Sequence, residues 1–182
     1  MDNEILEFRN GIFSLHTRRF GTIAEIMIQE LYDLNDSNNS AFDKSHKDTN
    51  ERIEIKFSRV MEAEKPISKS NAILSCKQAN FSNRVISSIE KNKEFDCNIQ
   101  QVKCKEFDIL YYGVFFKDHI EIFKMTNDEV KQCPGYSDKQ HRGNIGEGQF
   151  HINNKTITYH RENNLQQIIT YEELFNLFKK NQ

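Results

Sequence analysis

A stretch of alternating apolar and polar side chains just after residue 50 limits what this chain can fold into. Its members are Arg52, Ile53, Glu54, Ile55, Lys56, Phe57 and Ser58. Side chains on a β-strand point alternately to its two faces, so this period of two predicts a strand over residues 51–60. One face carries only apolar side chains and can lie on a core. The other face holds Glu54 and Lys56, which places a carboxylate beside an ammonium group.

The composition indicates one domain over residues 1–182, because this length is ordinary for one domain and sufficient for a real core. The net charge of −2 does not indicate a nucleic-acid partner, although a metal nuclease can confine its basic residues to one face. The four cysteines have no C-x-x-C spacing, which favours reduced thiols over a zinc site. No apolar run approaches a membrane span, and Asp2, Glu4 and Glu7 stand where a signal peptide would be basic. We therefore expect a cytoplasmic protein with no membrane segment.

Hydrophobic periodicity, capping signals and turn residues predict the other elements. We expect helices over residues 21–34 and 83–91. Two further helices are expected to begin at the T-x-x-E capping boxes of residues 126–129 and 170–173. The expected strands cover residues 98–103, 108–116, 119–125 and 150–159, with turns at residues 117–118 and 153–154. The glycine-rich residues 133–148 are expected to form a loop. The order of helix, sheet and helices predicts an α/β (α+β) fold with a mixed sheet flanked by helices.

A second carboxylate lies a short distance before the predicted strand. Asp43 belongs to the segment 41–46. If that segment pairs with the strand, Asp43 joins Glu54 and Lys56. Two carboxylates suit Mg²⁺, which takes oxygen ligands and keeps several waters for a phosphate to displace. A lysine beside the metal can orient or deprotonate the attacking water, so this set indicates metal-dependent phosphodiester hydrolysis.

Asp43, Glu54 and Lys56 resemble the motif of the PD-(D/E)xK nucleases, and among them the type II restriction endonucleases. Phe42 stands where the motif often has proline. The resemblance covers roughly residues 20–125 and implies a restriction-endonuclease-like core at about residues 18–125. It implies that Asp43 and Glu54 hold Mg²⁺, for which Mn²⁺ can substitute, and that Lys56 positions or activates water. It further implies double-stranded DNA as substrate and a cognate DNA methyltransferase that protects the host genome.

The same resemblance extends to residues around this set. Glu25, on the helix before the motif, is an expected catalytic residue that holds water or a second metal; an ordinary solvent-facing acid is the alternative. The family layout continues with a strand pair that runs from Gln101 to Leu110. Gln101 and Lys103 on it are expected to contact DNA, or else to form a polar edge. Ser58 shares the face of Lys56 and can bind a phosphate oxygen. Arg59 is also a candidate DNA contact, although it points the other way unless the strand ends there.

A second polar stretch indicates sequence-specific DNA recognition. Its candidate DNA-binding residues are Lys139, Gln140, His141, Arg142, Asn144 and Gln149. Arginine reads guanine, and asparagine or glutamine reads adenine, by paired hydrogen bonds in the major groove. We expect Arg142 to contact guanine. The alternatives are a plain polar loop, or a His/Asn site of the ββα-metal type; the second is disfavoured because no supporting helix pattern accompanies His141 and Asn144.

The sequence therefore predicts a Mg²⁺-dependent type II restriction endonuclease that cuts double-stranded DNA. The catalytic core is followed by the recognition loop and C-terminal helices at about residues 126–182. A homodimer would supply two active sites for a palindromic target, whereas a monomer acting twice would suit an asymmetric one. Two other readings stay open: a structure-specific repair or recombination nuclease, and a catalytically inactive DNA-binding specificity subunit.

Overall fold

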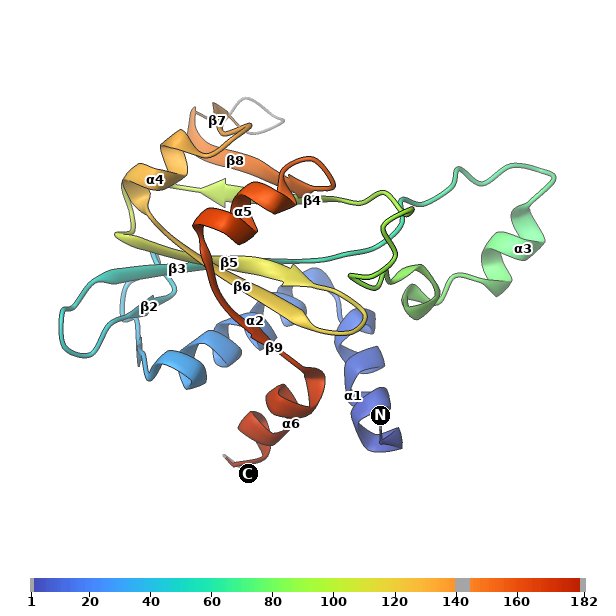
Figure 1. The fold of residues 1–182 in the computed structure, drawn as a ribbon, viewed down its shortest axis with the longest axis horizontal. Helices are drawn as coiled ribbons and strands as arrows, with labels where there is room; N and C mark the ends of the chain where they lie inside the picture. The colour runs from blue at the N-terminus through green and yellow to red at the C-terminus, as the bar shows by residue number, and fades with distance from the viewer. Residues whose placement is uncertain (1, 140–144, 181–182) are drawn as a thin grey trace.

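The computed structural model describes residues 2–139 and 145–180 and contains two β-sheets with helices around them (Figure 1). The helices are α1 (Asn3–Ser14), α2 (Thr17–Tyr32), α3 (Ala72–Lys77), the 3₁₀ turn η1 (Phe81–Arg84), α4 (Asn127–Gln132), α5 (Ile157–Asn163) and α6 (Tyr171–Lys179). The strands are β1 (Asn35–Asp36), β2 (Lys44–Ser45), β3 (Arg52–Arg59), β4 (Asp96–Val102), β5 (Ile109–Phe115), β6 (Ile120–Thr126), β7 (Ser137–Lys139), β8 (Ile145–Asn153) and β9 (Leu165–Ile169).

The larger sheet is mixed, as the sequence predicted. Its strand order is β1-β2-β3-β5-β6-β9. Strands β3 and β5 are parallel, with Glu54 opposite Leu110 and Lys56 opposite Tyr112, and the other neighbours in this sheet are antiparallel. The smaller sheet has the order β4-β8-β7 and is antiparallel. The mixed α/β class is therefore confirmed.

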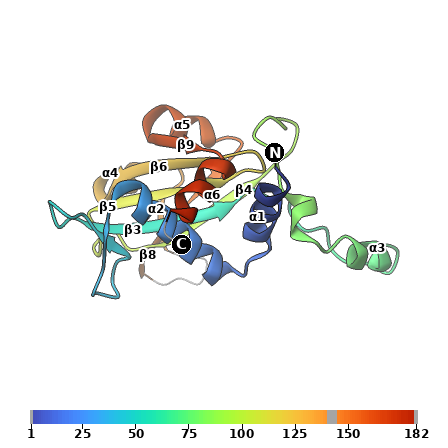
Figure 2. The same cartoon turned by 90° about the horizontal axis from the view of Figure 1, so that it is seen from below.

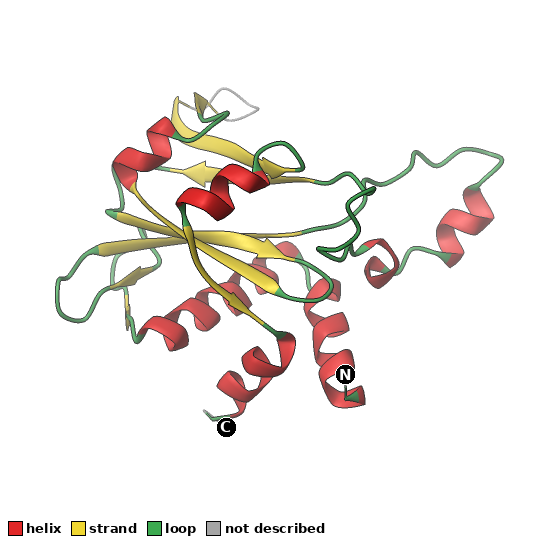
Figure 3. Ribbon diagram, viewed as in Figure 1, coloured by secondary structure: helices red, strands yellow, loops and turns green. Residues whose placement is uncertain are grey.

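Two hydrophobic cores lie on opposite faces of the larger sheet. Helices α1, α2 and α6 cover one face, where Ile53 and Ile55 of β3 are buried (Figure 3). The smaller sheet lies on the other face and encloses a second core that includes Leu110, Tyr112 and Phe150. The alternating side chains of β3 thus point to two different faces of the sheet, as the sequence predicted. Its apolar side chains pack under α2, while Glu54 and Lys56 lie on the face that the smaller sheet partly covers.

Several local predictions are confirmed. Strands β5 and β6 form the hairpin around Lys117 and Asp118, with Phe115 opposite Ile120. Both T-x-x-E motifs form complete capping boxes: Thr126 caps α4 and Thr170 caps α6. In each box the hydroxyl accepts from the backbone N–H three residues later, and the glutamate accepts from the backbone N–H of the threonine. These features depend on neighbours in sequence, which is why the sequence predicts them.

Other predictions are wrong, each because tertiary contacts outweigh the local pattern. Residues 83–91 are not a helix, because the backbone of this segment pairs with the chain after β3, where the Ile86 N–H donates to the Val60 carbonyl. Residues 150–159 are not a hairpin: β8 ends at Asn153 and α5 follows. The strand pair expected between residues 101 and 110 does not form either, since β4 pairs with β8. The expected loop at 133–148 contains β7 and the start of β8.

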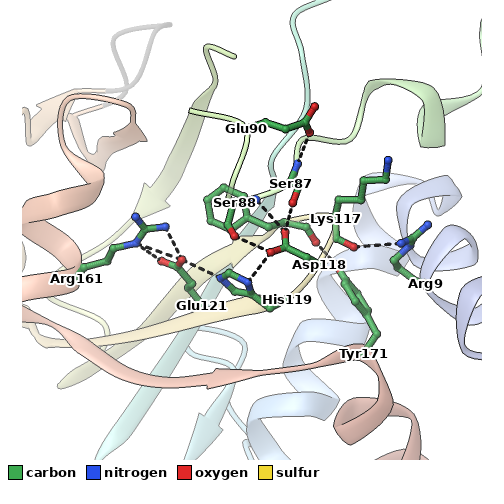
Figure 4. A network of polar contacts seen from close by, with 11 residues as sticks. Arg9, Ser87, Ser88, Glu90, Lys117, Asp118, His119, Glu121, Arg161 and Tyr171 are labelled. Atoms are coloured by element: carbon green, nitrogen blue, oxygen red, sulfur yellow. Dashed lines mark hydrogen bonds and ion pairs between the residues drawn. The ribbon is translucent and has the colours of Figure 1, made fainter. Parts of the chain in front are cut away.

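A polar network fastens the β5–β6 hairpin to its surroundings (Figure 4). The Asp118 carboxylate accepts hydrogen bonds from the hydroxyls of Ser87 and Ser88, at 2.9 and 2.6 Å. The His119 ring lies between Asp118 and Glu121, with nitrogen–oxygen distances of 3.1 and 3.0 Å. Arg161 of α5 closes the network on the buried Glu121. The hairpin is thereby tied to the turn that follows η1 and to α5.

None of the helices in the described part of the chain combines the length and the apolar character that crossing a membrane requires.

Candidate functional site

A polar cleft of about 240 Å³ opens between β3 of the larger sheet and the end of β4 in the smaller one. The residues that line it are Ser40, Ala41, Asp43, Glu54, Lys56, Gln101, Lys103, Glu106 and Glu147. The two sheets therefore bring together segments that lie far apart in the sequence. Five residues that the sequence marked as candidates, Asp43, Glu54, Lys56, Gln101 and Lys103, line the same cleft.

Asp43 reaches the cleft because its segment pairs with β3, which is the condition under which the sequence brings it to Glu54 and Lys56. Lys44 of β2 lies opposite Ile53, and the Asp43 N–H donates to the Ile53 carbonyl at 3.0 Å. The Asp43 side chain then accepts a hydrogen bond from the Ile55 backbone N–H at 2.8 Å. Its carboxylate is thus held against β3 at the level of Glu54 and Lys56.

Lys56 lies between the two carboxylates. Its ammonium group forms an ion pair with Glu54 and lies 3.6 Å from Asp43 Oδ2. It also donates to the Ile55 carbonyl oxygen at 3.3 Å. Burial alone would lower the pKa of Lys56, but the charges of Glu54 and Asp43 outweigh burial and raise it. Lys56 is therefore protonated, and it marks a place where a cation is favoured.

The Glu54 carboxyl is the most perturbed acid of the cleft. It is 8% exposed, and this burial raises its pKa to about 7. The Lys56 ammonium lowers the pKa in part, while Asp43 and Glu106 add to the increase. A carboxyl group poised near neutral pH in a cleft is typical of functional sites.

Glu25 of α2 belongs to the same electrostatic cluster. It is half-buried, and burial together with the charge of Asp43 raises its pKa, against the opposing effects of Lys44 and Lys56. Helix α2 packs against β3, which brings this acid near the motif. Glu25 is therefore near enough for the charges of Asp43, Lys44 and Lys56 to affect its pKa, but it is absent from the cleft lining.

Gln101 enters the cleft through an irregularity in β4. The β4–β8 register shifts between Gln100 and Val102, and Gln101 adopts a left-handed φ of 61°. Such a conformation is costly for a residue with a side chain, and bulges of this kind redirect side chains next to active sites. Lys103 follows and lies 3.4 Å from Glu106.

Sequence reasoning missed two acids of the cleft. Glu106 follows β4 and approaches the site from the turn before β5, while Glu147 lies on β8. The Lys103-x-x-Glu106 spacing was a weak local signal for Glu106. Glu147 sits between two glycines in the predicted recognition loop, and nothing around it in the sequence indicated an approach to β3.

Two expected DNA contacts on β3 lie outside this cleft. The Arg59 guanidinium donates to the carbonyl oxygens of Phe13 and Leu15, both at 2.7 Å, and lies over the Phe20 ring. The Arg59 guanidinium therefore holds the connection between α1 and α2. Ser58 interacts with the Cys97 side chain of β4 and is absent from the cleft lining.

The predicted recognition segment is described only at its two ends. Gln140, His141, Arg142 and Asn144 lie outside the described residues. Lys139 is exposed at the end of β7, and Gln149 lies on β8 opposite Ser137 and Gln100. The amide of Asn98 donates to the Gln149 side chain at 3.3 Å. Paired residues in an antiparallel sheet share a face, so a strip of amides on β4 and β8 surrounds Gln149.

The donor set of the cleft fits a hard divalent cation. Carboxylates outnumber ammonium groups, and a bound cation would offset the cost of ionising the buried Glu54. In residues 2–139 and 145–180, no three Asp, Glu, His or Cys side chains converge closely enough to hold a metal by themselves. Mg²⁺ needs only one or two carboxylates besides waters and substrate oxygens, and Asp43 and Glu54 are two such groups.

No protein-family model matches this chain, and no curated protein matches its sequence.

Proposed function

We propose that this chain is a Mg²⁺-dependent endonuclease of the type II restriction class, which hydrolyses phosphodiester bonds of double-stranded DNA at a specific sequence. One observation carries the proposal. Asp43, directly before β2, and Glu54 and Lys56 of β3 meet in one cleft, with the ammonium group of Lys56 in contact with both carboxylates. Two carboxylates can hold a divalent cation, and a lysine beside it can orient the attacking water, which supports metal-assisted phosphodiester hydrolysis.

Asp43 and Glu54 would hold the metal, and the Ile55 carbonyl oxygen is a third oxygen beside them, 3.3 Å from Lys56 Nζ. Mn²⁺ can substitute because it accepts the same oxygen ligands. When bound, the metal supplies Lewis-acid stabilisation of the charge that develops on the phosphoryl group.

The chain's own residues supply positioning and proton transfer. Lys56 is protonated and can donate hydrogen bonds to the attacking water and to a phosphate oxygen. The water attacks phosphorus in line with the 3′ oxygen, which departs as the P–O bond breaks. Glu25 has a raised pKa and lies near Asp43, so its carboxylate is a suitable acceptor for the proton that the water loses. The departing 3′ oxygen takes a proton from solvent.

The fold around the cleft supports the same proposal. A restriction-endonuclease-like core would consist of α2, the motif strand β3 and its neighbours β2 and β5. The amide strip at Gln149, Asn98 and Gln100 adjoins the cleft through Gln101 on β4 and Lys103 directly after it. Amide side chains pair with adenine edges in the major groove, which favours sequence recognition over recognition of DNA shape. A homodimer and a protecting DNA methyltransferase are the partners that this function implies.

A plasmid cleavage assay tests the proposal. Wild-type protein with Mg²⁺ should give discrete fragments from unmethylated DNA, and Asp43→Asn should give none because a metal ligand is lost. Glu172→Gln is a matched control, since Glu172 is an exposed acid on α6, and it should cut like wild type. Undiminished cleavage in EDTA contradicts the metal role. Nicks confined to branched or mismatched substrates favour the repair nuclease instead, and DNA binding without any cleavage favours the inactive specificity subunit.

A further inference from the structure

A projecting arm leaves the body of the molecule at the end of β3. It comprises residues 61–85, carries α3 and η1, and returns where Met61 bridges to Val85. Both orientations of the ribbon show α3 extended well away from the two sheets (Figures 1 and 2). None of the residues of α3 is buried. The arm is therefore not explained by packing onto either core.

The root of the arm is held firmly and its acids are neutralised there. The Glu62 N–H donates to the Arg84 carbonyl at 2.8 Å, and the Arg84 guanidinium donates back to the Glu62 carbonyl. The Glu62 carboxylate pairs with Lys93 at 2.7 Å, and Glu64 pairs with Arg84. The arm is thus fixed to the strand that carries Glu54, and its two carboxylates contribute little free negative charge.

The outer part of the arm is purely basic. Residues 65–80 contain Lys65, Lys69 and Lys77 and no aspartate or glutamate, in a chain whose net charge is −2. Within the described part of the chain, no carboxylate lies within 4.0 Å of these three ammonium groups. A run of sixteen residues with three cations and no acid concentrates positive potential on a segment that reaches into solvent.

The arm also presents a contact surface of its own. Ile67, Ile73 and Leu74 are 71%, 76% and 55% exposed. An open cavity of about 820 Å³ lies between the outer segment and the root, and Lys65, Ile67, Asn71 and Leu74 contribute to its lining. Exposed apolar groups mixed with lysine and asparagine are typical of segments that contact a DNA minor groove.

We propose that this arm binds the phosphate backbone of the DNA duplex beyond the cleft, with Lys65, Lys69 and Lys77 as the contacts. The inference rests on the proposed nuclease function. Lys56 and Met61 are five positions apart on nearly extended chain, a span of roughly 17 Å at about 3.3 Å per residue. One turn of DNA covers roughly 34 Å, so a duplex that is seated at Lys56 and runs along β3 would come within reach of the arm.

The charge of the arm favours DNA over a second copy of this chain. Two copies that met through Ile67, Ile73 and Leu74 would also bring six like charges together, which opposes association. A polyanion, in contrast, gains from each lysine by releasing a condensed counterion. A second copy is therefore the outcome against which the DNA proposal is tested.

The first experiment measures how salt affects DNA affinity. The variant is Lys65→Ala/Lys69→Ala/Lys77→Ala, and the probe is a 24-base-pair duplex in Ca²⁺. The control is Lys124→Ala/Lys155→Ala/Lys180→Ala, which removes three exposed lysines from other parts of the chain. Loss of three phosphate contacts should reduce the slope of log affinity against log salt by about 3, since each contributes about 0.9. The control should keep the wild-type slope.

The outcomes separate this inference from the proposed function. If wild-type protein binds no duplex, the nuclease proposal fails and the arm proposal fails with it. If wild type binds and the arm variant keeps the same slope, only the arm proposal is overturned. A reduced slope in the arm variant alone supports it.

A second experiment needs no arm substitution and remains informative if the triple variant does not fold. Cys76 on α3 is exposed, whereas Cys97, Cys104 and Cys133 are buried. Burial also raises the pKa of Cys97 and of Cys133 to about 12, so a maleimide reagent should modify Cys76 selectively. The duplex should slow this reaction at low salt and not at high salt. Protection that grows with protein concentration in the absence of DNA would show a second copy on the arm and overturn the proposal.

Discussion

The Glu54 carboxyl group is 8% exposed and lies against the ammonium group of Lys56. Its pKa of about 7 lies above the ordinary value of 4.5, so the folded protein holds this proton more tightly than the unfolded chain does. The contribution of Glu54 to stability is therefore fully present below about pH 4.5 and is lost as the pH rises through about 7. A bound divalent cation favours the ionised form and reverses this loss.

This titration predicts a metal-dependent change in melting temperature. Without Mg²⁺, wild type should lose stability between pH 5 and 8, and Glu54→Gln should lose less because the amide does not ionise. Mg²⁺ should raise the wild-type melting temperature more at pH 8 than at pH 6 and should leave that of Glu54→Gln nearly unchanged. Thermal denaturation at both pH values provides the measurement. An equal response of the two proteins to Mg²⁺ would remove Glu54 from the metal site.

The ammonium group of Lys56 should matter more to the rate than to affinity. Lys56→Ala leaves Asp43 and Glu54, the proposed metal ligands, in place but removes the group to which the proposal assigns the orientation of the water. The cleavage rate should fall by roughly two or more orders of magnitude, as expected for loss of a positioned proton donor. Affinity for DNA in Ca²⁺ should change little, and Lys124→Ala serves as a control for charge. Parallel losses of rate and affinity would instead make Lys56 an ordinary phosphate contact.

At the scale of elements, β3 connects three parts of the molecule. It carries Glu54 and Lys56 of the cleft, its last residue Arg59 holds the α1–α2 connection, and its end continues into the arm. One strand therefore supplies both residues of the candidate site and a residue that holds two helices in place. These roles follow one another along the strand: Glu54 and Lys56 line the cleft, Ser58 interacts with Cys97 of β4, and Arg59 contacts the α1–α2 connection.

Arg59 should accordingly contribute to stability and not to DNA binding. Arg59→Met keeps much of the apolar stem but removes the two hydrogen bonds to the carbonyls of Phe13 and Leu15. The free energy of unfolding should decrease by roughly 1.5–3 kcal/mol, the range for hydrogen bonds from charged groups. Urea denaturation measures this change. The salt slope of DNA binding should stay at its wild-type value; a decrease of about 0.9 would restore Arg59 as a phosphate contact.

At the scale of the whole molecule, the network around His119 joins the larger sheet to α5 and to the turn that follows η1 (Figure 4). Both ring nitrogens of His119 face carboxylates, those of Asp118 and Glu121. The hydrogen bond to Glu121 raises the pKa of His119; burial opposes the increase and the charge of Asp118 adds to it. The network therefore favours the cationic form of His119, whose contribution to stability is fully present below about pH 6.5 and is lost as the pH rises through its raised folded pKa.

The expected consequence is a pH-dependent cost of replacing this residue. His119→Gln should reduce the free energy of unfolding more at pH 6 than at pH 9, because the imidazolium is present only at the lower pH. His16→Gln is the control, since His16 is exposed at the start of α2. Denaturant titrations at the two pH values measure the difference. Equal costs at both pH values would mean that His119 is neutral in the folded protein.

The sequence by itself determined those features that depend on residues only a few positions apart. The alternation at Ile53, Glu54, Ile55 and Lys56 specified a strand with one buried and one polar face, and the threonine–glutamate boxes specified two helix starts. These signals are local because strand alternation and capping depend on residues at most a few positions apart. Asp43 could be associated with Glu54 and Lys56 for the same reason, since a single turn separates them.

Only the tertiary structure decided which distant segments meet. Strand β4 pairs with β8, about fifty residues away, and this pairing brings Gln101, Glu106 and Glu147 to the cleft. The direction of Arg59 depended on where the α1–α2 connection packs. Such contacts follow from burying two separate cores on opposite faces of one sheet, and that arrangement is a property of the whole chain. No local pattern encodes it, because the free energy gained by burial depends on area covered and not on neighbours in sequence.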